Sequence, residues 1–371
     1  MKIVADQHIP FVEHYFGHLG ELVLKPGRQI EHRDLLAADI LLVRSITKVN
    51  AVLLQDTAVK WVGSVTTGHD HLDIPWLEQH GIGWSTTAGF NATPVVEYVV
   101  CTIAALQCMG MLTQQTLQAC VIGVGKIGQQ VADVLNMLGW KVIFCDPLRA
   151  AQESSFVSIA LEECADMDLI TLHTPLTHTG QHSTFHLIDH AFLQRQKAQA
   201  VLLNTGRGAV VDSAALKKYG RFMQVCLDVW EHEPRIDRDS LQEATIATPH
   251  IAGYSVQARY RGVAMIYQAA QRAGMIDETT AALPLPPPVQ TCVFSGATRT
   301  WQEVVLTLFN PWLTTQVMKT ALLSDDQGGV FDQLRKEFKD RHEFASVSLA
   351  DVVLAEQDRR VLTALGFNIT G

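Results

Sequence analysis

A glycine-rich turn after a short apolar run constrains this chain more than any other part of its sequence. Residues 119–128 read Ala-Cys-Val-Ile-Gly-Val-Gly-Lys-Ile-Gly, which gives Gly123, Gly125 and Gly128 the spacing G-x-G-x-x-G. The branched apolar residues before the turn are typical of a buried parallel strand. In such a turn Gly123 permits the tight bend, Gly125 lets the backbone approach a pyrophosphate, and Gly128 allows close packing of helix on strand. The spacing therefore predicts a dinucleotide-binding turn.

The residues after the turn supply the remaining parts of a dinucleotide-binding unit. Apolar residues recur at helical spacing from Ile127 to Leu138, and Gly139 marks the end of that helix. A second apolar run, 141–145, then ends on Asp146. The helix N-terminus favours phosphate charge, while Asp146 can accept hydrogen bonds from ribose hydroxyls and repel the 2′-phosphate of NADP. Because strand, helix, strand and acid occur in this order, we predict that the cofactor is NAD.

Composition bounds the class of protein. A chain of 371 residues is long enough for two or three domains, and 47% hydrophobic with 18% charged residues is ordinary for a globular protein. The net charge of −9 and the lack of Lys/Arg runs argue against a nucleic-acid partner. An anionic substrate stays possible, because the local charge in a cleft matters more than the total.

The cysteines and the first residues indicate a cytoplasmic location. The seven cysteines show neither C-x-x-C pairs nor the spacing of metal ligands, so we expect reduced thiols and no metal site. The first residues, Met-Lys-Ile-Val-Ala-Asp, are typical of a strand rather than a signal peptide. No apolar run is long enough to span a bilayer, so we expect a soluble protein without membrane contact.

Strand and helix patterns alternate on both sides of the glycine-rich turn, which predicts parallel α/β structure. A mostly apolar helix over 95–109, starting after Pro94, leads into the turn, and a helical segment from 255 to about 275 follows the last strand. Strands are predicted at 3–5, 22–24, 40–43, 61–65, 169–173, 201–204, 225–229 and 246–247, with helical stretches at 31–38 and 51–54.

The last part of the chain reads as a separate folded unit. The Pro-rich segment 283–289 predicts an extended, stiff linker. Beyond it, 290–371 has its own apolar periodicity, which predicts helices over 301–318 and 331–341 and favours a strand at 347–349.

The polar residues that follow the later strands are candidates for chemistry, since the carboxyl ends of parallel strands form one ligand-binding edge. Arg207 could hold a carboxylate with its guanidinium fork, or it could be an exposed surface residue. His250 follows Pro249 and is a candidate for moving a hydroxyl proton, although an isolated histidine is often structural or solvated.

Two acidic residues at this edge complete the candidate chemistry. Glu233 is our candidate partner for His250, because a carboxylate stabilises an imidazolium and fixes its tautomer. Glu231 and His232 are adjacent alternatives. Asp228, at the end of its strand, could bind the nicotinamide carboxamide or merely cap a turn.

A second group of polar residues follows the strands of the N-terminal part. Arg44, Ser45, Thr47 and Lys48 combine two cations with two hydroxyl groups, which suits either an anion pocket or a solvated loop. Thr66 lies after the next strand, in a segment of small donors suited to contacts with a carboxylate.

Together these residues resemble the D-isomer-specific 2-hydroxyacid dehydrogenases. The resemblance rests on the glycine turn with Asp146, Arg207-Gly, Glu233-Pro and Pro-His250. Segments 43–50, 91–99 and 249–254, with the C-terminal unit, are most similar to a branch that oxidises a phosphorylated hydroxy acid in vitamin B6 biosynthesis.

The resemblance implies three domains and a homodimer. It implies a Rossmann-type doubly wound NAD-binding domain over 94–255 and a flavodoxin-like α/β substrate domain over 1–93 and 256–282. A C-terminal α+β dimerisation domain would occupy 290–371. By the same resemblance Arg207, Glu233 and His250 are catalytic and Ser45, Thr66 and Tyr254 contact substrate, with the loop from Arg44 facing its phosphate end. NAD would be held by Gly123, Gly125, Lys126, Ile127, Gly128, Asp146, Thr174, Asp228 and Gly253.

Two other functions remain open at this point. One is another NAD-dependent dehydrogenase of the same family, acting on 3-phosphoglycerate or glyoxylate. The other is a non-catalytic, NAD-sensing protein of the corepressor type. Lys126 and Gly206 depart from the residues usual in the family, and neither removes a group that the chemistry requires.

Overall fold

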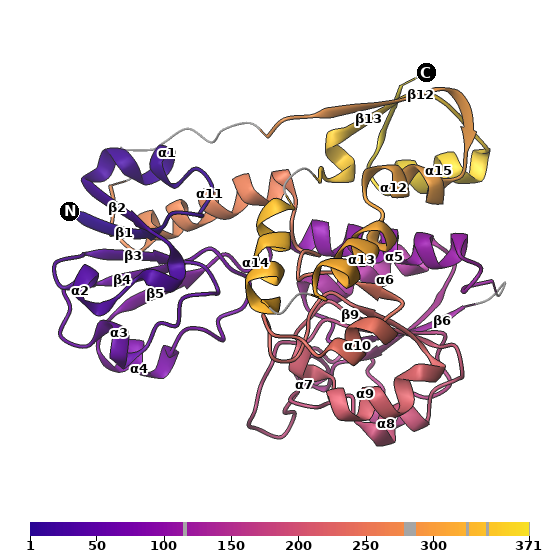
Figure 1. Cartoon of the computed structure of the whole chain (residues 1–371), viewed down its shortest axis with the longest axis horizontal. Coiled ribbons are helices and arrows are strands. Elements are labelled where there is room, and N and C mark those ends of the chain that lie inside the picture. The colour runs from indigo at the N-terminus through magenta and orange to yellow at the C-terminus, as the bar shows by residue number, and fades with distance from the viewer. Residues whose placement is uncertain (114–116, 278–286, 324–325, 339–340, 371) are drawn as a thin grey trace. The chain divides into compact units, whose positions relative to one another are not determined.

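The computed structural model describes residues 1–113, 117–277, 287–323, 326–338 and 341–370. The chain forms two compact units (Figure 1). Unit 1 comprises Met1–Asn91 and Val256–Pro288, and unit 2 comprises Ala92–Ser255 and Val289–Gly371. The chain therefore passes from unit 1 to unit 2 and back before its C-terminal part joins unit 2.

Unit 1 contains a parallel sheet with the strand order β2-β1-β3-β4-β5. The strands predicted at 3–5, 22–24, 40–43 and 61–65 are confirmed as β1 to β4, whereas β5 was not predicted. The helix predicted over 31–38 is shorter and spans only α2. The strands are β1 Lys2–Asp6, β2 Glu21–Lys25, β3 Ile40–Val43, β4 Trp61–Ser64 and β5 Gly83–Thr86, and the helices are α1 Val12–Phe16, α2 His32–Leu35, α3 Ala51–Leu54, α4 Ile74–Gln79 and α11 Val256–Arg272.

The all-apolar sequence of β3 explains why it lies inside the sheet of unit 1. Ile40 and Leu42 pack into one core, together with residues of α1 and α11. Leu41 and Val43 point to the opposite core, beneath α2, α3 and α4. Alternate residues of a strand face opposite sides of its sheet, so a continuous apolar run indicates a strand covered by helices on both faces.

Unit 2 contains a second parallel sheet, with the order β11-β10-β9-β8-β6-β7. All six strands had been predicted; the limits of β7, β9 and β11 match, and those of β6, β8 and β10 differ by one or two residues. The strands are β6 Gln118–Ile122, β7 Lys141–Cys145, β8 Leu169–Leu172, β9 Val201–Asn204, β10 Gln224–Leu227 and β11 Ile246–Ala247. The helices around them are α5 Ala92–Cys108, α6 Lys126–Met137, α7 Pro147–Gln152, α8 His190–Gln194, α9 Ser213–Tyr219 and α10 Arg238–Glu243.

The sheet of unit 2 is also buried on both faces. Val121 of β6 packs toward α5 and α6, while its neighbours Cys120 and Ile122 pack toward α8, α9 and α10. Figure 1 shows the two groups of helices on opposite sides of the strands. This arrangement leaves the carboxyl ends of the strands, and the loops after them, as the edge where polar side chains gather.

The C-terminal part of unit 2 adds a small parallel sheet in the order β12-β13-β14. It confirms a strand at 347–349, which extends further, whereas β12 and β14 were not predicted. Its elements are β12 Gln290–Arg299, β13 Val347–Leu354, β14 Asn368–Thr370, α12 Trp301–Leu308, α13 Pro311–Ala321, α14 Gln327–Glu337 and α15 Glu356–Ala364.

Two predicted C-terminal helices were wrong in their limits. The helix over 301–318 is in fact two helices, because Asn310 caps α13 and Pro311 occupies its first turn, where proline is favoured. The helix over 331–341 begins at Gln327 instead and ends before Arg341. Most of the predicted Pro-rich linker, up to residue 286, lies outside the described residues.

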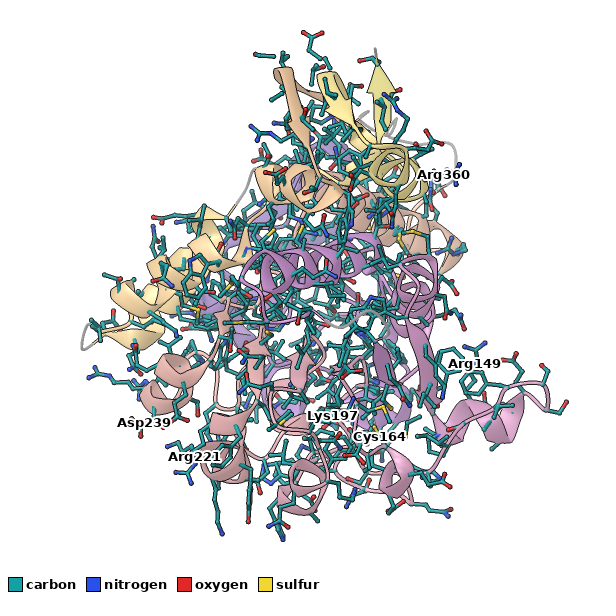
Figure 2. The ribbon with its side chains drawn as sticks, turned by 90° about the vertical axis from the view of Figure 1, so that its right-hand side faces the viewer. Arg149, Cys164, Lys197, Arg221, Asp239 and Arg360 are labelled. Carbon is teal, nitrogen blue, oxygen red and sulfur yellow. The ribbon has the colours of Figure 1, made fainter. Side chains whose placement is uncertain are left out.

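The described part of the chain contains no helix long and apolar enough to cross a membrane. All seven cysteines are free thiols, and Cys164, labelled in Figure 2, is fully buried beside Cys120 in the core of unit 2. Burial and neighbouring thiols raise the pKa of most of these cysteines, so they behave as small apolar residues.

Candidate active site

The glycine turn of unit 2 has a shape that only glycine allows. Gly123 has φ +83°, and a Cβ there would lie 2.8 Å from the backbone nitrogen of Thr174. A Cβ at Gly128 would lie 2.0 Å from the carbonyl oxygen of Gly123. At Gly125, the N-cap residue of α6, a Cβ would meet nothing within 4 Å. The first and third glycines are therefore required for packing, and the middle one borders open space.

Asp146 is fixed beside this turn by its own neighbours. Its Oδ2 accepts a hydrogen bond from Val124 N at 2.8 Å, and its Oδ1 accepts one from Arg149 N at 2.9 Å, which caps α7. Each carboxylate oxygen has a further lone pair for a ribose hydroxyl. Arg149 was not predicted; its Nη1 donates to Val124 O at 2.9 Å and so braces the same turn.

The residues around the turn fit a bound dinucleotide. The hydroxyl oxygen of Thr174 is buried, and no described residue makes a hydrogen bond to it. An orphaned hydroxyl beside the first glycine is what a ligand with acceptor oxygens would satisfy. Lys126 opens α6 on the exposed side, and Ile127 packs partly against the core of unit 2. The helix start adds backbone N–H groups and a favourable dipole.

The loop that carries Arg207 is shaped by a buried asparagine. Asn204, at the end of β9, accepts a hydrogen bond from Gly206 N at 3.0 Å and donates one to Arg207 O at 2.9 Å. These two bonds turn the backbone sharply after the strand. The guanidinium Nη1 of Arg207 donates to Gly206 O at 2.9 Å, so part of its fork is already oriented by the loop.

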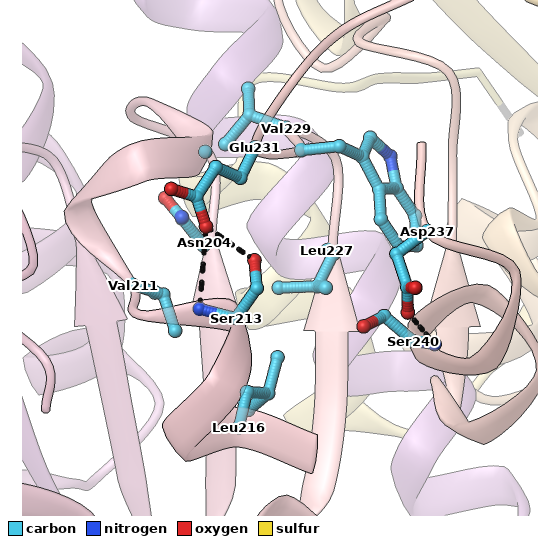
Figure 3. A pocket seen from close by; sticks show the side chains of 11 residues that line it. Asn204, Val211, Ser213, Leu216, Leu227, Val229, Glu231, Asp237 and Ser240 are labelled. Atoms are coloured by element: carbon cyan, nitrogen blue, oxygen red, sulfur yellow. Dashed lines mark hydrogen bonds between the residues drawn. The ribbon is translucent and has the colours of Figure 1, made fainter. Parts of the chain in front are cut away.

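Gly208 brings this loop against the one that follows β10. A Cβ at Gly208 would lie 1.9 Å from the carbonyl carbon of Trp230 and 2.3 Å from Glu231 N. The backbone at Gly208 is therefore in direct contact with the backbone at Trp230, which lies three residues before Glu233. Behind them lies a small cavity of about 20 Å³, room for about one water molecule (Figure 3).

Glu233 and His250 form the hydrogen-bonded pair at this edge. Glu233 Oε2 lies 2.8 Å from His250 Nδ1, and Oε1 accepts from Trp230 N at 2.8 Å. Burial would raise the pKa of Glu233, but His250 and other donors outweigh it and lower that pKa. The carboxyl group is therefore ionised near neutral pH, and the two side chains are about a fifth and a third exposed, at 21% and 32%.

Asp228 holds the turn from which His250 projects. Its buried carboxylate accepts hydrogen bonds from Thr248 Oγ1 at 2.6 Å and from the backbone nitrogens of Ile251 and Ala252 at 2.8 and 2.9 Å. His250 itself has φ +57°, and its N–H donates to Asp228 O at 2.7 Å. A strained backbone that is so fully held is common at functional sites. Of the two interpretations of Asp228, the geometry favours the turn cap.

Glu231, one of the alternatives to Glu233, has other partners. Its carboxylate accepts from Ser213 Oγ at 2.6 Å and lies 2.8 Å from His186 Nε2. Figure 3 shows it turned toward Ser213 and the cavity. Its neighbour His232 is 80% exposed and meets Glu231 only at 4.0 Å. Glu231 therefore braces the loop, and the structure pairs His250 with Glu233.

The candidate substrate residues Arg44, Ser45 and Thr66 all belong to unit 1, after β3 and β4. Arg44 Nε donates to the buried Asp6 at 2.8 Å, and Ser45 is exposed. Thr66 donates to Gly68 O at 2.8 Å.

The expected anion pocket has one hydroxyl donor fewer than its sequence suggests. The hydroxyl of Thr47 is buried and donates to Gly27 O at 2.9 Å. Of the two hydroxyl groups in this segment, that of Ser45 is therefore the one left for an anion.

Tyr254 and Gly253 follow the His250 turn, and Tyr254 meets a residue that was not predicted. Arg335, on α14, donates from Nη2 to the Tyr254 hydroxyl at 3.2 Å. No sequence signal marked this arginine, because it lies 81 residues further along the chain.

Comparison with known proteins agrees with this geometry. Residues 106–252 match the family model described as D-isomer specific 2-hydroxyacid dehydrogenase, NAD binding domain. An erythronate-4-phosphate dehydrogenase from Coxiella burnetii is 44% identical over 94% of this chain and 95% of its own length. One from Pseudomonas putida is 39% identical over 99% of both chains.

Solved structures agree at the level of the fold. A D-lactate dehydrogenase from Aquifex aeolicus, complexed with NAD and lactic acid, matches with a TM-score of 0.59 at 24% identity. The match covers 74% of this chain and 96% of that one. The near-complete coverage of the curated relatives settles the family: the chain belongs to the erythronate-4-phosphate dehydrogenases, within the D-isomer-specific 2-hydroxyacid dehydrogenases.

Proposed function

We propose that this protein oxidises 4-phospho-D-erythronate to (R)-3-hydroxy-2-oxo-4-phosphooxybutanoate with NAD, in the biosynthesis of pyridoxine 5′-phosphate. The names of its relatives support the substrate, and the matched NAD-binding family model supports the cofactor. The observation that carries the chemistry is the 2.8 Å contact between Glu233 Oε2 and His250 Nδ1.

That contact determines which nitrogen of His250 can act as a base. An ionised carboxylate only accepts hydrogen bonds, so the proton of neutral His250 resides on Nδ1. The lone pair of Nε2 is then available for the proton of the substrate's 2-hydroxyl group. When Nε2 has taken up that proton, His250 is a positively charged imidazolium. The neighbouring carboxylate of Glu233 stabilises this charge.

Arg207 is assigned to the carboxylate group that is attached to the reacting carbon. Its guanidinium can hold the substrate carboxylate in bidentate fashion and polarise the forming carbonyl. The Asn204 bonds and the Gly208 contact place this loop against the one that carries Glu233. Arg207 and the Glu233–His250 pair are therefore positioned by the same backbone contact.

The residues assigned to the cofactor would hold NAD and orient it. When bound, NAD would supply the acceptor for the hydride of C2, the carbon whose hydroxyl proton passes to His250. Gly123, Gly125 and Gly128 give backbone access for its pyrophosphate, with Lys126 and Ile127 in the same turn. Asp146 would hold the ribose. We further assign Thr174 and Gly253 to NAD contacts, and Asp228 to shaping that site through the His250 turn.

The substrate residues of unit 1 remain part of the proposal. Arg44 suits an anionic group, since its Nε is fixed by Asp6 while its other nitrogens extend the fork. Ser45 and Thr66 add hydroxyl groups after neighbouring parallel strands. Tyr254 contributes a phenol from unit 2.

We also propose the domain assignment and a homodimer. The order β2-β1-β3-β4-β5 supports a flavodoxin-like substrate domain, and the six-stranded order supports a doubly wound NAD-binding domain. Apolar side chains on β12 and α13 are exposed, such as Val293 at 62% and Leu313 at 62%. The proposal of pairing through 290–371 rests on the resemblance, and these exposed side chains lie in that part of the chain. Free cysteines support a cytoplasmic location.

The test is NADH formation with a panel of acids. We expect turnover with 4-phospho-D-erythronate, and little with 3-phosphoglycerate or glyoxylate. His250→Ala or Arg207→Ala should lower turnover by about 10²-fold or more. Either variant within tenfold of the parent would refute the assigned roles. A protein that binds NAD but oxidises no acid in the panel would favour the corepressor-like alternative.

A further inference from the structure

Helix α14, in the C-terminal part of the chain, reaches the candidate active site within unit 2. Phe331 is fully buried in the core beneath it, and Val330 and Leu334 pack against the same core. At the start of the helix, a Cβ on Gly328 would lie 3.5 Å from Pro234 Cγ, so the first turn of α14 contacts the residue after Glu233. The helix is therefore anchored beside the residues that carry the chemistry.

Arg335 projects from this helix to Tyr254. It lies four residues after Phe331, hence on the same side of α14. Its Nη2 donates to the Tyr254 hydroxyl at 3.2 Å, and its guanidinium carbon lies 5.9 Å from the centre of the Tyr254 ring. After His250, Arg335 is the charge that most lowers the pKa of Glu233. The guanidinium thus lies close to both a substrate residue and a catalytic residue.

The internal partners of Arg335 do not account for its burial. Its side chain is only 16% exposed; the carboxylate of Asp332 lies 4.0 Å from Nη1, and Glu233 supplies a second nearby negative charge. Its Nε is buried and makes no hydrogen bond to any described residue. A buried guanidinium with an unsatisfied donor costs free energy, and an anion is the group that removes this cost.

The chemistry of the proposed substrate supplies two anionic groups. Arg207 is assigned to the carboxylate, and one fork binds one such group in bidentate fashion. The phosphate needs a cation other than Arg207: Arg44 of unit 1 is one candidate and Arg335 is a second, since arginine matches phosphate geometry better than lysine does. The erythronate-4-phosphate dehydrogenase from Pseudomonas putida matches 99% of this chain, so the similarity includes the region of α14.

We propose that Arg335 is a substrate-positioning residue whose guanidinium, oriented by the Tyr254 hydroxyl, binds the phosphate group of the substrate. The inference rests on the proposed function. It makes the C-terminal part of the chain a contributor to substrate selection in addition to any role in assembly.

The test compares two substrates in Arg335→Gln and Arg335→Lys. Steady-state kcat/KM is measured with 4-phospho-D-erythronate and with unphosphorylated D-erythronate. Arg335→Gln should lower kcat/KM for the phosphorylated acid by about 10²-fold and leave the value for the other acid within about threefold. Arg335→Lys, which keeps the charge but loses the fork, should fall between. Lys336→Gln, on the exposed side of the same helix, is the matched control and should keep the parent's ratio.

A merely structural role would give a different result. If Arg335 only held Tyr254 or Glu233 in place, both substrates would lose kcat/KM equally, and that outcome overturns the proposal. The proposal is also overturned if neither kcat/KM value changes in Arg335→Gln.

Calorimetry with inorganic phosphate separates this inference from the proposed function. The NAD-loaded parent should bind phosphate, and Arg335→Gln should bind it at least about tenfold more weakly. Equal affinity, or no binding to the parent, contradicts the inference whether or not the parent oxidises 4-phospho-D-erythronate. A parent that binds phosphate through Arg335 but does not turn over this acid would refute only the proposed function.

Discussion

Gly208→Ala is the substitution that most sharply probes how the reacting groups are positioned. The added Cβ would lie 1.9 Å from the carbonyl carbon of Trp230, 2.1 Å from its oxygen and 2.3 Å from Glu231 N. All three are backbone atoms, so no side-chain rotation can relieve the overlap. Real Cβ atoms essentially never approach closer than 3.0 Å, so the two loops must separate by about 1 Å.

The expected cost follows from that displacement. Moving a catalytic group by about 1 Å can lower activity by about 10²-fold, so we expect kcat/KM for 4-phospho-D-erythronate to fall by this factor. Overpacking should also destabilise the fold by about 1–3 kcal/mol. NAD affinity should change by less than about threefold, because the glycine turn follows a different strand, β6.

The assay is steady-state NADH formation, with thermal unfolding and NAD titration on the same preparations. Gly17→Ala is the control, because a Cβ there meets nothing within 4 Å and its φ of −65° suits alanine. The control should match the parent. If Gly208→Ala is folded and keeps kcat/KM within about threefold, the contact between the loops does not position Arg207 against Glu233.

Three further predictions follow from individual contacts. Gly128→Ala should abolish measurable NAD binding in a titration, since its Cβ would lie 2.0 Å from Gly123 O; retained affinity would show that the turn can open. Asp228→Asn should lower kcat by about 10²-fold and the free energy of unfolding by about 1–3 kcal/mol, because an amide cannot accept from all three donors; a fully active variant would contradict this. The pKa of Glu233 is lowered on folding, so its stabilisation is present above its ordinary value of 4.5 and lost as pH falls through the folded pKa. Denaturant unfolding of Glu233→Gln and the parent should therefore differ most above that pH and converge below it, and a constant difference would refute the linkage.

The sheets were predictable where one physical signal dominated. Uniformly apolar strands such as Ile40–Val43 and Val201–Asn204 are buried on both faces, and the predicted limits match the structure. β5, with the sequence Gly-Trp-Ser-Thr, lies at the sheet edge and is only partly buried, so its sequence carries little apolar signal. β12 is mostly exposed and broken by an irregularity between Val293 and Ala297, and its pattern is weak for the same reason.

The site was predictable to the extent that it follows strand ends. Arg207, Glu233 and His250 each come shortly after a strand of one parallel sheet, and the fold brings the latter two into contact. The preference for Glu233 over Glu231 rested on the resemblance alone, because two neighbouring carboxylates differ only in where the backbone turns them. Arg335 could not be found, since its role depends on how a distant helix packs. The break at Pro311 could have been found, because Asn-Pro is an N-cap and first-turn signature.

The central claim is that this chain oxidises 4-phospho-D-erythronate at C2: His250 takes the proton of the 2-hydroxyl group, and the hydride leaves the carbon that bears it. The most direct test is the rate of NADH formation by the full chain with this acid, beside unphosphorylated D-erythronate and beside His250→Ala. We predict turnover of the phosphorylated acid with kcat/KM more than about tenfold above that of the other acid, and its loss in His250→Ala. NAD binding without oxidation of the phosphorylated acid, or full turnover by His250→Ala, would contradict the claim.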